Sequence, residues 1–299
     1  MILVAGLTPA WQQIALLDRL RVGEVNRARE VHWCASGKVL NVGLALTQLG
    51  ASVRTLSLIG SDAAGDAMRQ DMADLGVDVR WIESAARQRV CTTLLDCDSM
   101  QTTEIVENSL AATSAELAAF ETAFAEEAAS GNVEFVILTG SLPINTPSDY
   151  YAKLLDHTRA KAILDIRGAE LLATWRHAPF LVKPNREELA QTVQRPLSSA
   201  DDVWQAMREI HDFGAVWAVV TNGPDEVLAS HVEQQTAISD RFLFDVPRVE
   251  VVNPIGCGDC FTAGLACALQ RDSDMPTAIR AGISAASRNA EQLLPARIG

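Results

Sequence analysis

Short apolar runs alternate with longer amphipathic stretches along most of the chain. The runs at 2–5 and 162–165 have the length and the apolar content of buried strands. At 41–49, apolar side chains recur at helical spacing, which predicts a helix. The same criteria predict strands at 53–59, 135–138, 216–220 and 249–252, and helices at 65–75, 147–158, 201–213 and 261–269. This repeated order of strand and helix predicts an α/β fold with a mainly parallel central sheet and helices on both faces.

Two stretches depart from this rhythm. Residues 10–33 and 87–108 contain no convincing helical pattern and alternate apolar with polar side chains. We expect them to form antiparallel strands of a small flap outside the main sheet. Because no repeat, low-complexity tract or linker-like segment interrupts the chain, we expect one domain over 1–299, with the flap as its lid.

Composition and charge narrow the class of protein. The chain carries 25 Lys and Arg against 38 Asp and Glu, a net charge of −13. This balance argues against a surface for nucleic acid or for an anionic membrane. No apolar run reaches the roughly 18–20 residues of a membrane span, and the first residues lack the basic flank of a signal peptide. The 6 cysteines are too sparse for a disulfide scaffold, so we expect a cytoplasmic protein with reduced thiols.

The most informative segment is the Gly-rich turn Gly256-Cys257-Gly258-Asp259, which joins a predicted strand to a predicted helix. Backbone amides of 256–258 at a helix N-terminus would form an anion site. Asp259 beside them would accept a proton from a hydroxyl while the amides stabilise a transferred phosphoryl group. An unperturbed Asp has a pKa of about 3.9, which is low for a base acting on an alcohol. An Asp that only caps the helix would give the same local pattern.

Four further segments carry polar side chains at strand ends or helix starts. In 183–188, Asn185 and Glu188 have the spacing of a capping box, and they would equally suit Mg²⁺-bound water near phosphates. The others are 35–42, with Gly37, Lys38 and Asn41; 139–143, with Ser141; and 221–223, with Thr221 and Gly223. The chain has no P-loop, no dinucleotide-binding glycine fingerprint and no zinc-like spacing of His.

Together and in this order, the segments resemble the PfkB (ribokinase-like) family of carbohydrate kinases over essentially the whole chain. The branch with 1-phosphofructokinase and tagatose-6-phosphate kinase is the most similar, on the Gly-Glu-Val-Asn-Arg of 23–27, Ser-Gly-Lys-Val-Leu-Asn-Val, Thr-Gly-Ser-Leu-Pro, Lys-Pro-Asn-Arg-Glu-Glu-Leu and Asn-Pro-Ile-Gly-Cys-Gly-Asp. The resemblance implies a ribokinase-like three-layer sandwich with a β-strand lid. It also implies ATP-dependent phosphoryl transfer, assisted by Mg²⁺, to a hydroxyl of a sugar phosphate.

The resemblance also implies a role for each matching residue. Asp259 would be the catalytic base, and the amides of Gly256, Cys257 and Gly258 the anion hole. The nucleotide would be bound by Lys183, Asn185, Glu188, Thr221, Gly223 and Asn289, with Glu188 holding the metal through water. The sugar would be bound by Gln12, Gly37, Lys38, Asn41 and Ser141, and its phosphate by Arg89. The open edges of the lid strands would suit a homodimer.

Several positions depart from the branch and leave the acceptor open. Gln12 stands where the branch has an Asp that holds sugar hydroxyls, Val39 replaces a glycine, and Cys91 replaces an Asn. Arg167 adds a cation that would reach a phosphate. A kinase of an unphosphorylated sugar or nucleoside, and a non-catalytic sugar-binding relative, therefore remain alternatives. Cys257 and Cys260 also form a Cys-x-x-C at a helix start, which would suit a redox protein or an oxidation switch on a kinase.

Overall fold

The larger of two β-sheets forms the centre of the computed structural model, which describes residues 1–233 and 240–299. Within these residues its strand order is β13-β12-β11-β10-β9-β8-β1-β4-β5. Neighbours from β11 to β5 run parallel, and β12 and β13 are added antiparallel at one edge. The strands are β1 (Ile2–Gly6), β4 (Val53–Gly60), β5 (Val79–Ser84), β8 (Phe135–Thr139), β9 (Lys161–Asp165), β10 (Leu181–Val182), β11 (Trp217–Val220), β12 (Val227–His231) and β13 (Asp240–Phe244).

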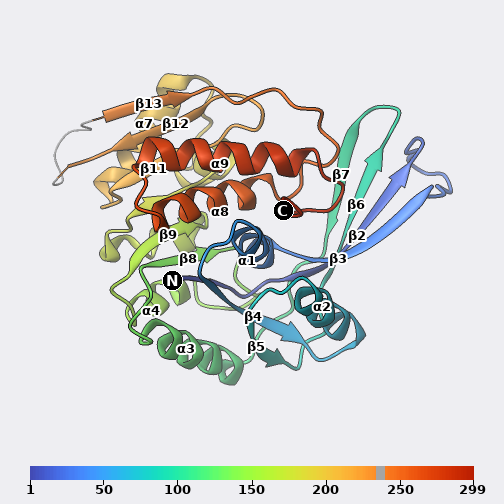
Figure 1. Ribbon diagram of the computed structural model, residues 1–299, viewed down its shortest axis with the longest axis horizontal. Helices are drawn as coiled ribbons and strands as arrows, with labels where there is room; N and C mark the ends of the chain where they lie inside the picture. The colour runs from blue at the N-terminus through green and yellow to red at the C-terminus, as the bar shows by residue number, and fades with distance from the viewer. Residues whose placement is uncertain (234–239) are drawn as a thin grey trace.

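Helices cover both faces of this sheet, as the sequence predicts (Figure 1). One layer holds α1 (Lys38–Gln48), α2 (Ala63–Asp74), α8 (Cys257–Gln270) and α9 (Met275–Ala290). The other holds α3 (Ser114–Ala128), α4 (Tyr150–Leu155), α5 (Gly168–Leu172), α6 (Arg186–Thr192) and α7 (Ala200–Asp212), and a 3₁₀ turn lies at Trp175–His177. In β1, Ile2 and Val4 pack into the first layer and Leu3 into the second, which explains its continuous apolar run. None of the helices in the described ranges has both the length and the hydropathy to cross a membrane.

The second sheet is the predicted lid, and it projects from one end of the body (Figure 1). Its strands are β2 (Ala10–Leu17), β3 (Glu30–Ser36), β6 (Val90–Asp96) and β7 (Gln101–Val106), in the order β3-β2-β6-β7. The expected antiparallel pairing is correct within each hairpin, but β2 and β6 pair in parallel. The reason is that β2 follows β1 and β6 follows β5, so both leave the carboxyl ends of parallel strands in the same direction.

Four predicted elements need correction. Residues 249–252 are not a strand: Val251 and Val252 are exposed, and the amide of Val252 donates to the carbonyl of Ala290 at the end of α9. The segment is tethered to a helix end, so its apolar residues have no sheet to join. The helix expected at 147–158 is shorter, Tyr150–Leu155. Helices α1 and α8 begin earlier than predicted, because Gly37 and Gly256 adopt positive φ at their N-caps.

Two glycines let α8 and α9 pack closely together. A Cβ atom on Gly264 would lie 2.6 Å from the carbonyl oxygen of Ala281, and one on Gly282 would lie 2.8 Å from that of Phe261. The contact fixes α8 against the C-terminal part of the chain. It thereby places the N-terminus of α8 at the carboxyl edge of the sheet, under the lid.

Candidate active site

A cavity of about 470 Å³ lies between the carboxyl edge of the main sheet, the lid and the N-terminus of α8. Of the site residues predicted from sequence, the structure brings together Gln12, Gly37, Lys38, Asn41, Arg89, Lys183, Asn185, Glu188, Thr221, Gly223, Gly256, Cys257, Gly258 and Asp259 along its wall. Ser141 and Asn289 do not line it. The predicted segments therefore converge on one place, although they come from distant parts of the chain.

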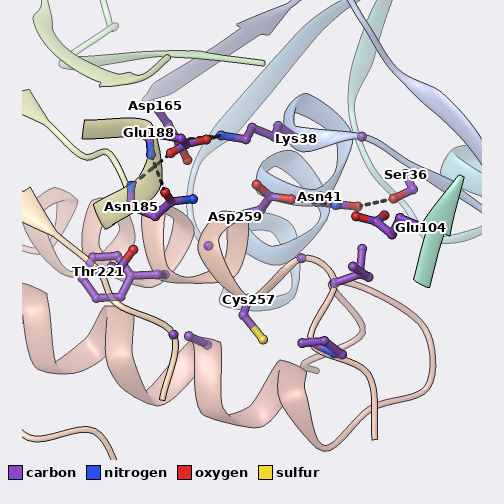
Figure 2. A pocket seen from close by; sticks show the side chains of 18 of the residues that line it. Ser36, Lys38, Asn41, Glu104, Asp165, Asn185, Glu188, Thr221, Cys257 and Asp259 are labelled. Atoms are coloured by element: carbon purple, nitrogen blue, oxygen red, sulfur yellow. Dashed lines mark hydrogen bonds and ion pairs between the residues drawn. The ribbon is translucent and has the colours of Figure 1, made fainter. Parts of the chain in front are cut away.

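Asp259 lies in the first turn of α8 and is 6% exposed. Its Oδ2 accepts a hydrogen bond of 2.7 Å from Asn41 Nδ2, and Asn41 Oδ1 accepts one of 3.2 Å from Ser36 Oγ (Figure 2). Burial raises the pKa of Asp259 to about 7, and the Asp165 carboxylate adds to this, while Lys38, Asn41 and Lys183 oppose it. The ordinary pKa expected from sequence is therefore wrong, and the carboxylate is better matched to proton transfer near neutral pH.

A cluster of opposite charges lies beside Asp259. Lys38 Nζ lies 2.9 Å from Asp165 Oδ1 and 3.0 Å from Glu188 Oε1. Lys183 Nζ lies 3.3 Å from Asp165 Oδ2, which also accepts a hydrogen bond of 3.0 Å from Thr262 Oγ1. Asp165 is 1% exposed; burial opposes its ionisation, but Lys183 and Lys38 hold its pKa below the usual value. Two lysines and two carboxylates thus compensate one another inside the cavity.

Asn185 and Glu188 form the capping box of α6 and also face the cavity. Asn185 Oδ1 accepts from the Glu188 amide at 2.7 Å, and Glu188 Oε2 accepts from the Asn185 amide at 3.0 Å. The second oxygen of Glu188 is left for Lys38. Asn185 also pairs with Thr221 through an isolated parallel bridge, which sets β11's carboxyl end beside α6. Asn185 and Glu188 can therefore cap the helix and still offer polar atoms to a ligand in the cavity.

At the end of the cavity next to the lid, polar side chains make hydrogen bonds to other groups of the protein. Gln12 Nε2 donates to Thr93 Oγ1 at 2.7 Å, and Gln12 is buried. The Arg89 guanidinium donates to the carbonyls of Thr8, Pro9 and Glu107 at 2.8, 3.2 and 3.3 Å. Glu104 of β7 also lines the cavity here. The carboxylate of Glu104 is a feature that the sequence motifs did not predict.

Asn289 and Ser141 lie elsewhere than predicted. Asn289 is fully buried behind the glycine turn: its Nδ2 donates to the carbonyl of Ile255 at 2.8 Å, and its Oδ1 accepts from the Ala296 amide at 2.6 Å. It also contacts the sulfur atoms of Cys257 and Cys260 at 3.3 and 3.4 Å. Its amide thus holds the turn from behind rather than facing the cavity. Ser141 is exposed outside the cavity.

The two thiols of the Cys-x-x-C lack the features of a reactive pair. Both are free, Cys260 is buried, and burial raises the pKa of each thiol. Reactive cysteines instead have a lowered pKa and an accessible sulfur. The geometry therefore gives no support to a redox protein.

Besides Glu104, sequence reasoning missed Asp165, Thr262 and Ser36 at the site. Asp165 ends an apolar strand, a position where ligands of α/β sheets bind, so a signal was present. Thr262 and Ser36 carried no such signal, because their importance comes from the partners they reach: Asp165 for Thr262 and Asn41 for Ser36.

A mainly parallel sheet between two helical layers, with a smaller sheet at one end, matches the ribokinase-like fold. Residues 2–295 match the profile described as pfkB family carbohydrate kinase, and the chain belongs to this family. It is a kinase of a sugar or a sugar phosphate. Kinases of this family use ATP and a divalent metal.

Solved structures similar to this chain include three kinases. Phosphofructokinase-2 from Escherichia coli, in complex with substrates and products, gives a TM-score of 0.88 at 24% identity, covering 99% of this chain and 94% of that chain. A possible 1-phosphofructokinase from Thermotoga maritima gives 0.86 at 16%, covering 98% and 93%. A ribokinase from Thermotoga maritima gives 0.76 at 18%, covering 99% and 94%. At these identities, the likeness establishes the fold.

Proposed function

We propose that the protein transfers the γ-phosphoryl group of ATP to a hydroxyl of a sugar phosphate, with Asp259 as the base. The observation that carries the proposal is a buried carboxylate with a pKa near 7 in the first turn of a helix whose N-terminus opens on the cavity. In this position Asp259 takes the proton of the acceptor hydroxyl as the phosphoryl group arrives. The amides of Gly256, Cys257 and Gly258 stabilise the charge on that group.

The nucleotide lies at the end of the cavity formed by α6, α8 and α9. Lys183, Asn185, Thr221 and Gly223 provide its polar wall. An apolar wall of Val227, Val246, Ile283 and Ala286 suits a flat aromatic base. Asn289 is fully buried behind the glycine turn, so we assign it to holding this turn and not to contacting the aromatic base of the nucleotide.

The carboxylates of Asp165 and Glu188 fit a divalent cation, because the oxygens that face the cavity already share one positive charge. Mg²⁺ keeps several waters and takes few protein oxygens. Among the described residues, no group of three or more His, Cys, Asp or Glu side chains is placed to hold a metal. Glu188 through water, together with Asp165, would hold Mg²⁺, and the ion would neutralise phosphate oxygens.

The acceptor occupies the lid end, where Gln12, Gly37, Lys38 and Asn41 face the cavity. Arg89 is assigned to the phosphate of the acceptor, because three of its five N–H groups hold carbonyls and the rest are left for a ligand. Closure of the lid over the acceptor would exclude water and limit ATP hydrolysis.

A second candidate acceptor is an unphosphorylated sugar. The observation that favours it is the carboxylate of Glu104 on the same wall as Arg89, since an anion there opposes a phosphate and suits hydroxyl groups. The two candidates share the same base and nucleotide site and differ only in what Arg89 contacts.

The test is Mg·ATP-dependent release of ADP with fructose 1-phosphate, tagatose 6-phosphate, fructose 6-phosphate, fructose, ribose and a nucleoside. Turnover with a sugar phosphate, lost in Asp259→Asn, supports the proposal. Arg89→Ala should then lower kcat/KM for the sugar phosphate, by a factor that corresponds to a loss of a few kcal/mol of transition-state stabilisation. The KM for ATP should change little. Equal losses for phosphorylated and unphosphorylated acceptors would remove Arg89 from the phosphate site. No turnover by folded, ATP-binding protein would favour the non-catalytic alternative.

We further propose that the outer face of the lid pairs with a second copy of the chain. Trp33, Gln13, Thr92 and Ile105 lie in one row across the four strands, on the face opposite Gln12 and Glu104. Trp33 is 45% exposed and Ile105 59%, so the two ends of the row present apolar surface to solvent. Sedimentation should show a dimer that Ile105→Lys dissociates; a monomeric wild type would contradict this pairing.

A further inference from the structure

The ammonium group of Lys38 joins two carboxylates that belong to separate elements. Lys38 begins α1, Asp165 ends β9 and Glu188 lies in the first turn of α6. The Lys38 nitrogen lies 2.9 Å from Asp165 Oδ1 and 3.0 Å from Glu188 Oε1. Figure 2 shows the Lys38 side chain pointing toward both carboxylates. One cation thus sits at the point where the two carboxylates meet.

The other oxygen of each carboxylate is already committed to the protein. Asp165 Oδ2 accepts from Thr262 and pairs with Lys183. Glu188 Oε2 accepts from the amide of Asn185 in the capping box. Of these two carboxylates, Asp165 Oδ1 and Glu188 Oε1 are therefore the oxygens left to bind a cation in the cavity, and both contact Lys38.

The charge on Lys38 is firmly held. Its ammonium group hydrogen-bonds Asp165 Oδ1 and Glu188 Oε1, so two negative charges hold it between them. A divalent ion such as Mg²⁺ needs to approach carboxylate oxygens to about 2.1 Å. It cannot do so while the ammonium occupies the space between them, and the two charges also repel each other.

The two lysines of the cluster differ in their freedom to move. The Lys183 side chain is 3% exposed, whereas that of Lys38 is 35% exposed on the cavity side. A long flexible side chain with this exposure can leave its partners when an anion offers a better one. Lys183 has no comparable exit.

We propose that Lys38 is the resident counter-cation of Asp165 and Glu188, which keeps free divalent metal out of the site until the phosphates of a bound nucleotide draw Lys38 away. The inference rests on the proposed function for the nature of the nucleotide. Its consequence is that metal enters together with the nucleotide. The displaced ammonium then adds positive charge where the phosphoryl group is transferred.

The test is Mn²⁺ binding to the full chain without nucleotide or sugar, measured by electron paramagnetic resonance of the free ion. We expect the wild type and Lys38→Arg to bind Mn²⁺ weakly. Lys38→Met should bind it about tenfold more tightly or better, because the competing charge is gone. The gain should vanish in Lys38→Met combined with Glu188→Gln, which keeps an acceptor for the Asn185 amide.

Lys38→Gln is a second neutral variant for the case that Lys38→Met does not fold, because its amide can still donate a hydrogen bond to one carboxylate. Circular dichroism checks that each variant is folded. Folded Lys38→Met and Lys38→Gln proteins with no gain in Mn²⁺ affinity would overturn the proposal, as would a gain that survives Glu188→Gln. Because no nucleotide or acceptor is present, this failure is separate from failure of the kinase assay.

Discussion

The raised pKa of Asp259 predicts that the Asp259→Asn variant is more stable than the wild type but less active. The substitution keeps the size of the side chain, and the new amide oxygen can still accept the hydrogen bond from Asn41 Nδ2. It removes a negative charge that the folded protein disfavours. In the wild type, the pKa of this carboxyl rises from 3.8 to about 7 on folding, with burial as the main cause.

The sign and size of the effect follow from proton linkage. Below pH 3.8 both folded and unfolded chains bind the proton, and Asp259 has no effect on the free energy of unfolding. As pH rises to about 7, only the folded chain keeps the proton, so the wild type loses stability. The loss reaches about 4 kcal/mol above that pH, at 1.36 kcal/mol per pKa unit. Asp259→Asn should therefore be more stable than the wild type by up to this amount at pH 8, by about 2 kcal/mol at pH 5, and hardly at all at pH 4.

The assay is urea unfolding of both proteins at several pH values, paired with ADP release under saturating Mg·ATP. We expect kcat to fall by about 10²–10⁴-fold, the range for loss of a general base, with the KM for ATP nearly unchanged. A variant that is less stable than the wild type at pH 8, or equally stabilised at pH 4 and 8, would refute the burial argument. Near-normal kcat would refute the assignment of the base.

Four other outcomes are expected. The wild-type kcat/KM should rise with pH up to about 7, where Asp259 ionises, and a flat profile between pH 5 and 8 would contradict this. Ser36→Ala removes the donor that orients Asn41 and should lower kcat about three- to tenfold, whereas Ser36→Thr should restore it. A thiol reagent should modify exposed Cys97 before Cys257 or Cys260. If diamide is shown to join Cys257 and Cys260 in a disulfide and the activity does not change, an oxidation switch is excluded. Gly264→Ala should destabilise the protein by about 1–3 kcal/mol in thermal unfolding, because its methyl would overlap α9.

Much of the fold could be read from local pattern. The apolar runs at 2–5, 135–138 and 162–165 predict buried parallel strands, because every position in such a strand faces one of two helical layers. Residues 249–252 show where this reasoning fails. Their composition is that of a strand, but a strand also needs a partner edge, and here the backbone is tied to the end of α9.

The location of the site was also predictable in large part. Glycine turns, capping residues and polar side chains at the ends of parallel strands must meet at one edge of the sheet, so the motifs converge there. Ser141 and Asn289 are the exceptions. The helix that bears Asn289 carries this residue behind the turn that it supports. Its position depends on how α8 and α9 pack, which the close approach at Gly264 decides.

The sequence by itself determined the α/β class, the lid, the residues of the glycine turn and the kinase family. Only the tertiary structure decided the electrostatics of the site. Lys38 and Asp165 are 127 positions apart, and Asn41 and Asp259 are 218 apart. The pKa of Asp259 depends on burial and on which charges lie a few ångströms away. Both are properties of packing between distant segments, and no local pattern of residues records them.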